Sequence, residues 1–420
     1  DMLYDLTDIY EANISDFARE SIEGDPFAIP AATFDGRLYA IPNPSTPQID
    51  GGDSMYFRTD WLSNLGLSVP ATIDELYDVM YAFANDDPDQ NGQDDTFGFY
   101  LDNKLGAVTL FAAMYGEYPR IWTMADDGSV QWGGVSDGMK DVLVKLAELY
   151  KDGIIDPEFT VKDSSIAGED IGAGKHGLMF ASWIAGYDAM KYSISNSETA
   201  DWEAYTVVSA TDEPAKVNAP FNVSTFYVVS KDCEHPEALV AIANYDFERG
   251  YDLRMELIEP MFDPELHGQM HAYVPTGFAP ANKNLHIQQR ILAWQEGGDE
   301  SELWPDDIAN WNTQQTFYSD RDPNGFSHKV TFGPYHSGLS CVQEYIDADR
   351  YVYDAYTGAD TENMIEYNGT LEALQLEYYT KIITGGDADA LWDEFVSTWY
   401  SSGGDLVTED VNDWYADQAA

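Results

Sequence analysis

Apolar residues recur every three or four positions in several long segments, which is the spacing of one face of a helix. The clearest are residues 136–151 and residues 73–84, where Thr72 and Glu75 form the capping-box pattern that opens a helix. Short apolar runs bounded by turn residues lie between these segments and are typical of strands. Further helices are predicted over residues 163–174, 286–294, 371–384, 388–402 and 408–420.

The short apolar runs predict strands around which the helices pack. Residues 178–181 follow the helix stop Gly174 and are short enough for a strand of a parallel sheet. Residues 54–58 form a similar run, and Asp35-Gly36 is a two-residue turn that predicts a hairpin. Because helices alternate with these strands, the pattern predicts an α/β fold.

Composition narrows the class of protein. The chain has 420 residues with 44% hydrophobic content, which is globular, and no run approaches the roughly 20 apolar residues of a membrane helix. The net charge is −54, from 75 acidic and 21 basic residues. Such an excess argues against nucleic acid, whose binding needs Lys and Arg, and against anionic lipid surfaces. A solvated acidic surface on an exported protein is the plain explanation, and a salt-loving host is the alternative.

The two cysteines bear on disulfide bonding, and the N-terminal residues bear on whether the chain has been processed. Cys233 and Cys341 could form one disulfide, but sequence cannot pair them, and we expect buried free thiols. The N-terminus is acidic, lacks the basic region of a signal peptide and does not begin with Met. We therefore expect a processed, trimmed or incomplete chain.

Residues 87–95 form an oxygen-rich loop with the spacing of a calcium-binding loop. The potential ligands at positions 1, 3, 5, 7 and 9 are Asp87, Asp89, Asn91, Gln93 through its backbone carbonyl, and Asp95. Gly92 stands at position 6, where such loops turn, but position 12 is Gly98 and the usual bidentate Glu is missing. The loop predicts a structural calcium site. The alternative is a polar turn whose side chains bond their own backbone.

Several blocks stand in the order and spacing of one known family. They are R-T-D-W-L at 58–62, L-G-L-S-V-P at 65–70, L-Y-K-D-G-I-I-D-P-E-F at 149–159, G-K-H-G-L-M-F at 174–180 and H-P-E-A at 235–238. The chain resembles the family 1 extracellular solute-binding proteins, the lipoprotein-type sugar-capturing subunits of ABC importers. The resemblance spans nearly the whole chain.

The resemblance implies a two-lobed periplasmic-binding-protein-like fold of type II, with many helices and hinge strands between the lobes. Residues 1–53 and 229–330 are expected to form lobe one, and residues 54–228 and 331–420 lobe two. The first strands of lobe one, which family members carry upstream, are expected before Asp1 and are not in this sequence.

Aromatic residues make up 14% of the chain, and flat rings suit the apolar faces of sugars. Trp183 is the leading ligand-binding candidate because it follows a predicted strand end, where α/β proteins place ligands. Residues 309–340 read as Gly- and Pro-rich loops, where an aromatic is less easily explained by core packing. The remaining candidates are Tyr187, Tyr39, Tyr56, Arg120, Trp122, Trp304, Trp311, Tyr335 and His336. Each aromatic could equally be core, and Arg58 reads as a structural ion pair with Asp60.

The resemblance implies a monomeric extracellular protein, a bacterial surface lipoprotein or a periplasmic one, that captures an oligosaccharide and delivers it to ABC permease subunits. A binding protein for peptides or another small solute is the alternative. A glycan-acting enzyme is a weaker alternative: no G-x-S-x-G, H-E-x-x-H or P-loop pattern is present. Glycosidases need two carboxylates at about 5–9 Å, and 75 acids supply such pairs by chance.

Overall fold

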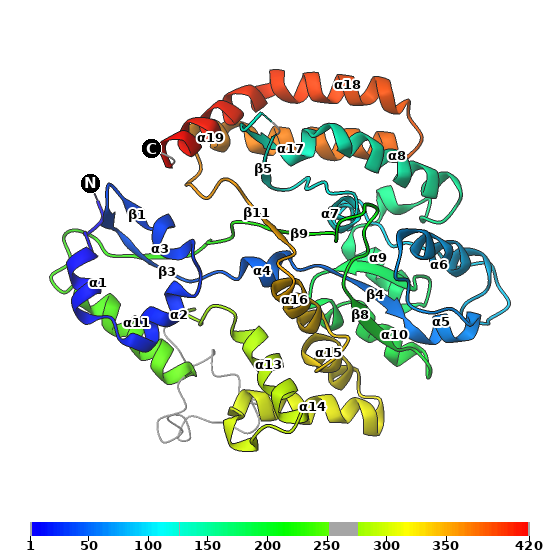
Figure 1. Ribbon diagram of the computed structural model, residues 1–420, viewed down its shortest axis with the longest axis horizontal. Helices are drawn as coiled ribbons and strands as arrows, with labels where there is room; N and C mark the ends of the chain where they lie inside the picture. The colour runs from blue at the N-terminus through cyan, green and yellow to red at the C-terminus, as the bar shows by residue number, and fades with distance from the viewer. Residues whose placement is uncertain (1, 126, 252–275, 419–420) are drawn as a thin grey trace. The chain divides into compact units, whose positions relative to one another are not determined.

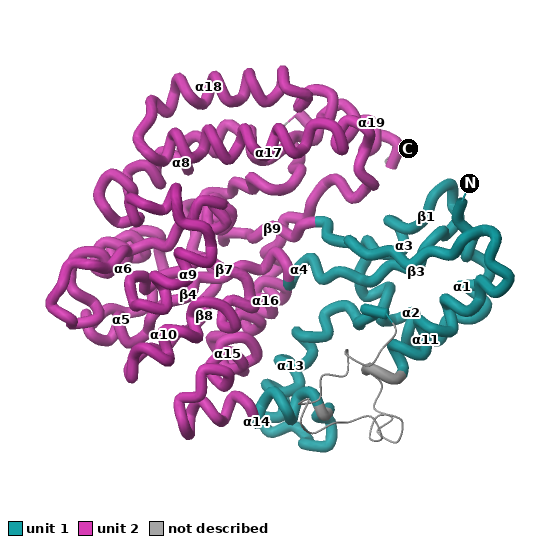
Figure 2. The backbone as a smooth tube through the Cα atoms, turned by 180° about the vertical axis from the view of Figure 1, so that it is seen from behind, with its two compact units in different colours: residues 1–49, 221–312 teal, residues 50–220, 313–420 magenta. Residues whose placement is uncertain are grey.

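The computed structural model describes residues 2–125, 127–251 and 276–418 (Figure 1). These residues form two compact units (Figure 2). Unit 1 comprises residues 1–49 and 221–312, and unit 2 comprises residues 50–220 and 313–420. The chain therefore passes between the units three times, and each unit is built from segments distant in sequence.

The unit boundaries fall at other positions than the lobe boundaries expected at 53, 228 and 330. The largest difference concerns residues 313–330, which belong to unit 2. The reason is that α15 (Pro323–Phe332) packs on η3 (Ala185–Tyr187) and α10 (Met190–Asn196), both of unit 2.

The main sheet of unit 2 has the strand order β7-β4-β8, with β4 (Ser54–Arg58) in the centre. Both neighbours, β7 (Leu178–Ala181) and β8 (Trp202–Tyr205), run antiparallel to β4. The expected parallel setting of residues 178–181 is therefore wrong. Short runs of similar composition do not reveal their direction, because pairing depends on where the chain returns from.

Helices surround this sheet (Figure 1). Residues 73–84 and 136–151 form helices almost as predicted, α6 (Ile73–Asn85) and α8 (Asp137–Lys151), and the side chain of Thr72 caps α6. The other elements of the first half of unit 2 are α5 (Thr59–Leu65), α7 (Val108–Ala113), β5 (Trp122–Met124), β6 (Val130–Trp132), η1 (Gly133–Val135), η2 (Phe159–Val161), α9 (Ser164–Gly172) and β9 (Val217–Ala219).

Three helices close the chain. α17 (Glu362–Ile383) packs on α8 and α18 (Ala388–Trp399), and α19 (Asp405–Gln418) packs beside β6. A π-helical turn, η8 (Tyr400–Gly404), joins the last two. Before them lie α16 (Gly338–Asp347) and β11 (Tyr351–Tyr353), which pairs in parallel with β9.

Unit 1 has its own core, around Leu6, Tyr10, Ile41 and Phe247. The predicted Asp35-Gly36 turn is confirmed, since both residues have positive φ and join β1 to β2. The elements of unit 1 are α1 (Thr7–Asn13), α2 (Asp16–Glu23), α3 (Ala28–Ala31), β1 (Thr33–Phe34), β2 (Arg37–Leu38), β3 (Ala40–Pro42), β10 (Phe226–Val228), α11 (Glu237–Tyr251), α13 (Lys283–Gln295) and η7 (Glu300–Glu302); α4 (Pro47–Gly51) and α14 (Pro305–Asp320) span a unit boundary.

The loop expected over residues 309–340 is mostly helix, because it contains the end of α14 and all of α15. Pro323 is suited to a first helical turn, and the Asp322 side chain accepts from the backbone N–H of Gly325, so the two residues start α15. The few apolar residues of α14 show little periodicity, which explains why the helix was missed.

Both cysteines are free, as expected, but only Cys341 is buried, whereas Cys233 is exposed. Cys233 precedes α11 in a turn, and Cys341 lies in the interior face of α16. Within the described part of the chain, no helix combines the length and the apolar character needed to cross a membrane.

The core of unit 2 leaves no room at Gly177, which precedes β7. A Cβ atom there would lie 2.2 Å from Cε3 of Trp61 and 2.8 Å from Cδ2 of Phe83. Gly177→Ala should therefore lower the free energy of unfolding by about 1–3 kcal/mol, the usual cost of overpacking. Urea unfolding measures it. Gly106→Ala is the control, since a Cβ there meets nothing within 4 Å; equal stability of the two variants would contradict the packing described.

Candidate ligand-binding site

The register of the main sheet brings three segments to one edge. Ser54, the first residue of β4, pairs with Ala181, the last of β7, and Met55 pairs with Tyr205, the last of β8. Asp53 and Trp183 therefore lie at the edge of the sheet where β4 begins. We call it the entry edge, because β4 begins shortly after the chain passes from unit 1 into unit 2.

Trp183 is half-buried beyond the end of β7 and leaves part of its surface open to a ligand. Its ring meets Phe332 edge-on, with 6.3 Å between centroids. A Cβ at Gly338 would lie 2.5 Å from Cα of Trp183, so the start of α16 packs directly against its backbone. The side chain is thus carried on a firmly held backbone.

Tyr56 is a core residue and does not suit the role expected of it. Its side chain is fully buried, and its hydroxyl donates to the Ser182 carbonyl at 2.9 Å. Burial raises the pKa of Tyr56 well above its ordinary value, so the hydroxyl stays a neutral donor. The residue therefore supports the backbone next to Trp183. The sequence of β4 could not reveal that Tyr56 is a core residue, because all five residues of the strand are buried and its two faces do not differ.

Asp53 is a candidate that the sequence did not single out. It is half-buried, and burial raises the pKa of its carboxyl to about 7, while the positive charge of Arg120 acts in the opposite direction. Its backbone carbonyl accepts from the Tyr345 hydroxyl at 3.2 Å. No described residue donates a hydrogen bond to its carboxylate. This carboxyl at the entry edge is available to a ligand.

Arg120 lines a pocket of about 540 Å³ together with Lys104, Trp132, Glu372, Gln375 and Tyr379. A hydrogen-bond chain fixes its wall: Nε1 of Trp132 donates to Oε1 of Gln375 at 2.8 Å, and Nε2 of Gln375 donates to the Pro119 carbonyl at 3.0 Å. The Tyr379 hydroxyl donates to the Gly134 carbonyl at 2.7 Å. We call this the Arg120 pocket. It combines an aromatic wall with charged and amide groups, as ligand pockets do.

Trp122 lies close to this pocket but is 7% exposed. Its ring meets that of Trp132 at 5.4 Å, and its backbone N–H donates to Oδ1 of Asp354 at 3.1 Å. Trp132 therefore offers the accessible ring of this pair to the Arg120 pocket, and it was not among the predicted residues. No spacing in the sequence distinguishes the two tryptophans of a short hairpin.

Tyr187 lies at a second hollow of about 950 Å³, lined also by Tyr100, Tyr192 and residues of α9. Its ring contacts His328 at 5.4 Å between centroids. Burial raises the pKa of Tyr187 above its ordinary value, so the phenol stays neutral.

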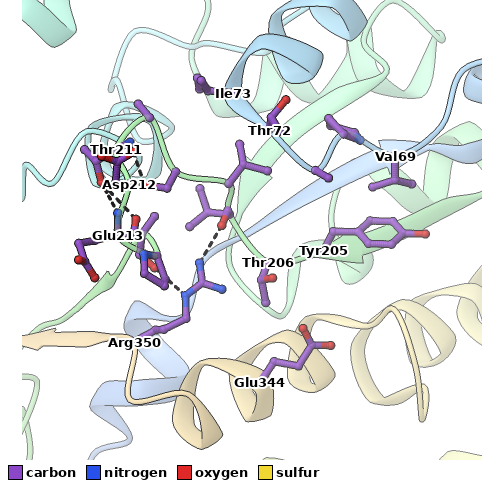
Figure 3. A pocket seen from close by; sticks show the side chains of 18 of the residues that line it. Val69, Thr72, Ile73, Tyr205, Thr206, Thr211, Asp212, Glu213, Glu344 and Arg350 are labelled. Carbon is purple, nitrogen blue, oxygen red and sulfur yellow. Dashed lines mark hydrogen bonds between the residues drawn. The ribbon is translucent and has the colours of Figure 1, made fainter.

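A further hollow, of about 1030 Å³, lies beside the loop of residues 206–215 (Figure 3). Arg350 reaches this loop and donates to the carbonyls of Val207 and Ala215 at 2.7 and 2.6 Å, so its guanidinium fixes the loop. His336 lies at the rim with its ring 4.7 Å from that of Tyr205. Its neighbour Tyr335 is exposed.

Three predicted residues belong to unit 1. Tyr39 is half-buried and meets the ring of Phe34 at 6.5 Å. Trp304 lies under the guanidinium of Arg290, at 4.2 Å from the ring centroid, and Trp311 packs edge-on against Trp294 at 5.4 Å. All three remain predictions, as do the other candidate residues.

The oxygen-rich loop brings its side chains together through hydrogen bonds of its own, and the Asn91 side-chain oxygen accepts from the backbone N–H of Gln93 at 2.6 Å. Nδ2 of Asn91 lies 2.8 Å from Asp89 and 3.3 Å from Asp95, and the Asp87 carboxylate accepts from the backbone of Gly92 at 3.1 Å. Burial, then the nearby Asp87 and Asp95, raise the pKa of Asp89. Converging carboxylates that repel one another fit a calcium ion.

Position 12 of that loop explains its departure from the standard pattern. A Cβ at Gly98 would lie 1.9 Å from the Met80 carbonyl oxygen, so no side chain can stand there. The usual Glu ligand is thus sterically excluded, and the set is restricted to positions 1–9.

A second acidic group, Asp156, Asp170 and His176, lies within 4.8 Å, but lysines already neutralise its carboxylates. Lys162 is 2.5 Å from Asp156 and 2.6 Å from Asp170, and Lys175 is 2.6 Å from Asp170. Burial lowers the pKa of His176 to about 4, so its ring is neutral. The group reads as an ion-pair network between α9 and β7.

No family model matches the chain. Among curated proteins, it is 24% identical to lipoprotein LipO of Bacillus subtilis over 379 residues, which cover 86% of this chain and 68% of LipO. It is 33% identical over 154 residues to the polygalacturonan/rhamnogalacturonan-binding protein YtcQ of Bacillus subtilis, and 30% over 166 residues to the fructooligosaccharide ABC transporter substrate-binding protein FusA of Streptococcus pneumoniae. These two matches cover 36% and 37% of this chain and only 30% of each relative.

Solved structures match over nearly the whole chain. The alginate-binding protein AlgQ2, determined without calcium ion, aligns with 99% of this chain and 82% of its own, at a TM-score of 0.59 and 15% identity. An EF-hand mutant of FusA from S. pneumoniae with fructo-nystose aligns with 100% of this chain and 84% of its own, at a TM-score of 0.56 and 17% identity. The chain is a relative of ABC-transporter solute-binding proteins. The family resemblance and the two-lobed α/β fold class expected from the sequence are confirmed.

Of the residues described at the entry edge and in the Arg120 pocket, the sequence singled out Trp183 and Arg120 and did not single out Asp53, Lys104 and Trp132. Asp53 precedes a predicted strand, which was a usable signal; Lys104 and Trp132 had none.

Asp53→Asn should stabilise the protein in a pH-dependent way. Burial raises the pKa of Asp53 from 3.8 to about 7, so the folded state holds this proton more tightly than the unfolded chain. Ionisation therefore destabilises the fold as pH rises from 4 to 7. Asn copies the neutral form. Since one pKa unit corresponds to about 1.4 kcal/mol, we expect a gain on the order of 1–3 kcal/mol at pH 8 and almost none at pH 4.

Urea unfolding at the two pH values measures this gain. The exposed Asp94→Asn is the control, since it removes a carboxyl that is in solvent. A gain that is equal at pH 4 and pH 8 would show that the Asp53 carboxyl is not perturbed in the fold.

Proposed function

We propose that this chain is an extracellular solute-binding protein that captures an oligosaccharide and delivers it to an ABC importer. The observation that carries the proposal is the half-buried Trp183 at the entry edge of a fold shared with ABC-transporter solute-binding proteins. Relatives named for binding polygalacturonan and fructooligosaccharide support a sugar ligand.

The chemistry of the site suits a sugar. A tryptophan ring covers the apolar face of a pyranose, and its N–H gives it a polar end. Asp53, Gln375 and Arg120 offer acceptors and donors for hydroxyl groups, and buried partners hold Trp132 and Gln375 in place before ligand arrives. Such preorganisation reduces the entropy lost on binding.

Delivery to a transporter requires that loaded and empty protein differ. The chain crosses between its two units at three places, which is the connectivity of a hinge. A ligand shifts an equilibrium between two arrangements only by its difference in affinity for them. The proposed partners are permease subunits of the importer, and the proposed location is the bacterial surface or periplasm, with the protein as a monomer.

No catalytic activity is proposed, because the named relatives are binding proteins. A thermal-shift screen tests the class. An oligosaccharide that binds the folded state raises the melting temperature in line with RT ln(1 + [L]/Kd), whereas peptides should not. Stabilisation by peptides alone, or turnover of a chromogenic glycoside, would contradict the proposal.

Trp183→Ala should weaken binding of the oligosaccharide found in that screen at least tenfold, because the stacking surface is removed. Isothermal calorimetry measures the affinity. Trp183→Phe, which keeps a flat ring, should retain most of it. Tyr318→Ala, which removes an exposed aromatic of α14, is the control. Unchanged affinity in Trp183→Ala would remove this residue from the site.

We also propose a structural calcium ion in the oxygen-rich loop, held by Asp87, Asp89, Asn91, Asp95 and the Gln93 carbonyl. The convergence of these groups supports it, and so does the mention of calcium or an EF-hand in the titles of two solved relatives. The ion would join the end of α6 to the following segment and neutralise the carboxylates.

EDTA should lower the melting temperature by several degrees, since a ligand that binds only the folded state stabilises it. Asp89→Ala should melt at that lower temperature with or without EDTA, and oligosaccharide preference should not change. Asp94→Ala, outside the proposed ligand set, should keep the full response. Identical melting of the parent protein in calcium and in EDTA would refute the site.

A further inference from the structure

Cations are scarce in this protein, so their placement carries information. In unit 2 most of the described lysines are paired with carboxylates: Lys140, Lys145, Lys162, Lys175, Lys329 and Lys381. Lys104 and Arg120 form no ion pair with a described carboxylate, although 75 acidic residues are available. These two cations, neither of which is paired with a described carboxylate, line the same pocket.

The turn that ends in Leu105 brings the backbone of Lys104 to the Arg120 guanidinium, and both residues line the pocket. The Asp102 carboxylate accepts from the backbone N–H of Lys104 at 2.9 Å and from the Tyr100 hydroxyl at 3.2 Å. Leu105 adopts a φ of +54°, which is uncommon for a non-glycine residue and characteristic of functional turns. Nη2 of Arg120 donates to the Lys104 carbonyl at 3.2 Å, which ties the guanidinium to the turn.

Three described carboxyl groups oppose the two cations: Asp102, which accepts from the backbone N–H of Lys104, Glu372 and Asp53. Glu372 on α17 is exposed at the pocket and forms no ion pair with a described residue. Asp53 acts on Arg120, but burial raises the pKa of Asp53 to about 7, so at neutral pH it offsets only part of that charge. Trp132 supplies the aromatic wall beside these groups.

We infer that the Arg120 pocket binds a uronic acid residue, whose carboxylate is held by Lys104 and Arg120 while the sugar ring lies along Trp132. The inference rests on the proposed function and names its substrate class, an anionic oligosaccharide. A guanidinium presents a planar fork that matches a carboxylate, and such charge-assisted hydrogen bonds are roughly twice as strong as neutral ones. A neutral sugar could accept hydrogen bonds from the two cations but would form no ion pair with them.

The net charge of −54 opposes an anionic ligand at a distance but not in contact. The Debye length is about 8 Å at physiological ionic strength, so distant surface carboxylates are largely screened. Direct contacts within the pocket are screened much less. Affinity for a uronate must therefore come from the local pair, and removing either member should have a large effect.

The ligand comparison comes first. Calorimetry on the whole chain at pH 6.5 and 0.15 M salt measures binding of oligogalacturonate and oligomannuronate. Their carboxyl-reduced forms, which keep the linkage and size and lose the charge, are the matched neutral probes, and a sulfated galacto-oligosaccharide is the other anion. We expect an acidic uronate to bind at least tenfold more tightly than its reduced form and than the sulfate ester.

The variants then locate the preference. Lys104→Gln and Arg120→Gln should each lower the uronate affinity at least tenfold and leave the reduced form almost unchanged. Glu372→Gln removes the opposing carboxylate and should tighten uronate binding two- to fivefold. Lys151→Gln removes the same charge elsewhere and should have no effect, since Lys151 is exposed at the end of α8 and forms no ion pair with a described residue. Melting temperatures verify folding, and Arg120→Lys, which keeps the charge, should keep part of the preference.

The outcomes separate the two proposals. Equal or tighter binding of neutral or sulfated oligosaccharides would overturn the uronate assignment and leave the proposed function intact, as would a uronate preference that survives Lys104→Gln and Arg120→Gln. Absence of binding to every oligosaccharide, with stabilisation by peptides, would overturn the proposed function itself.

Discussion

The antiparallel register of β4 between β7 and β8 is the constraint on which the rest of unit 2 depends. All five residues of β4 are buried, and a slip of one residue would exchange the side chains of its two faces. At one end of the strand, Arg58 forms a bidentate pair with Asp60 at 2.7 and 2.6 Å, and its guanidinium lies near the rings of Trp61 and Trp202, at 5.0 and 5.8 Å.

This pair is the structural ion pair that the sequence suggested for Arg58. Removing Asp60 would destabilise the fold strongly, because a buried guanidinium without its partner costs several kcal/mol. One end of β4 is therefore fixed by charge and aromatic contact. This also fixes the register at the other end of β4, and the register places Asp53 and Trp183 at the entry edge.

Local signals predicted local structure well. α6 and α8 follow from helical periodicity and from the cap at Thr72, and the hairpin turn follows from Asp35-Gly36, because each depends on residues close in sequence. Strand direction did not follow, since the pairing of β7 with β4 joins residues more than 120 positions apart. The helices α14 and α15 were missed because their few apolar residues show no clear stripe.

The candidate site, too, contains residues that the sequence could indicate and residues that it could not. Trp183 was predicted to be accessible because it follows a strand end, and it is half-buried there. The fully buried Tyr56 was misjudged because a strand buried on both faces shows no alternation. Lys104 could not be found from the sequence at all. What distinguishes it is that it lines the same pocket as Arg120 while neither forms an ion pair with a described carboxylate, and that is visible only once distances are known.

Trp183 and Arg120 differ in how they are held, and this difference bears on what each can contribute. The backbone of Trp183 is confined by Gly338, the Tyr56 hydroxyl bonds the preceding carbonyl, and the ring meets Phe332 edge-on. Arg120 is exposed and tied by one hydrogen bond to the Lys104 carbonyl.

A rigid aromatic surface discriminates poorly among sugars, because many pyranoses offer an apolar face. A charged pair favours an anionic ligand, because charge-assisted hydrogen bonds are roughly twice as strong as neutral ones. Under the proposed function, affinity from the entry edge and selectivity from the Arg120 pocket would therefore be separable.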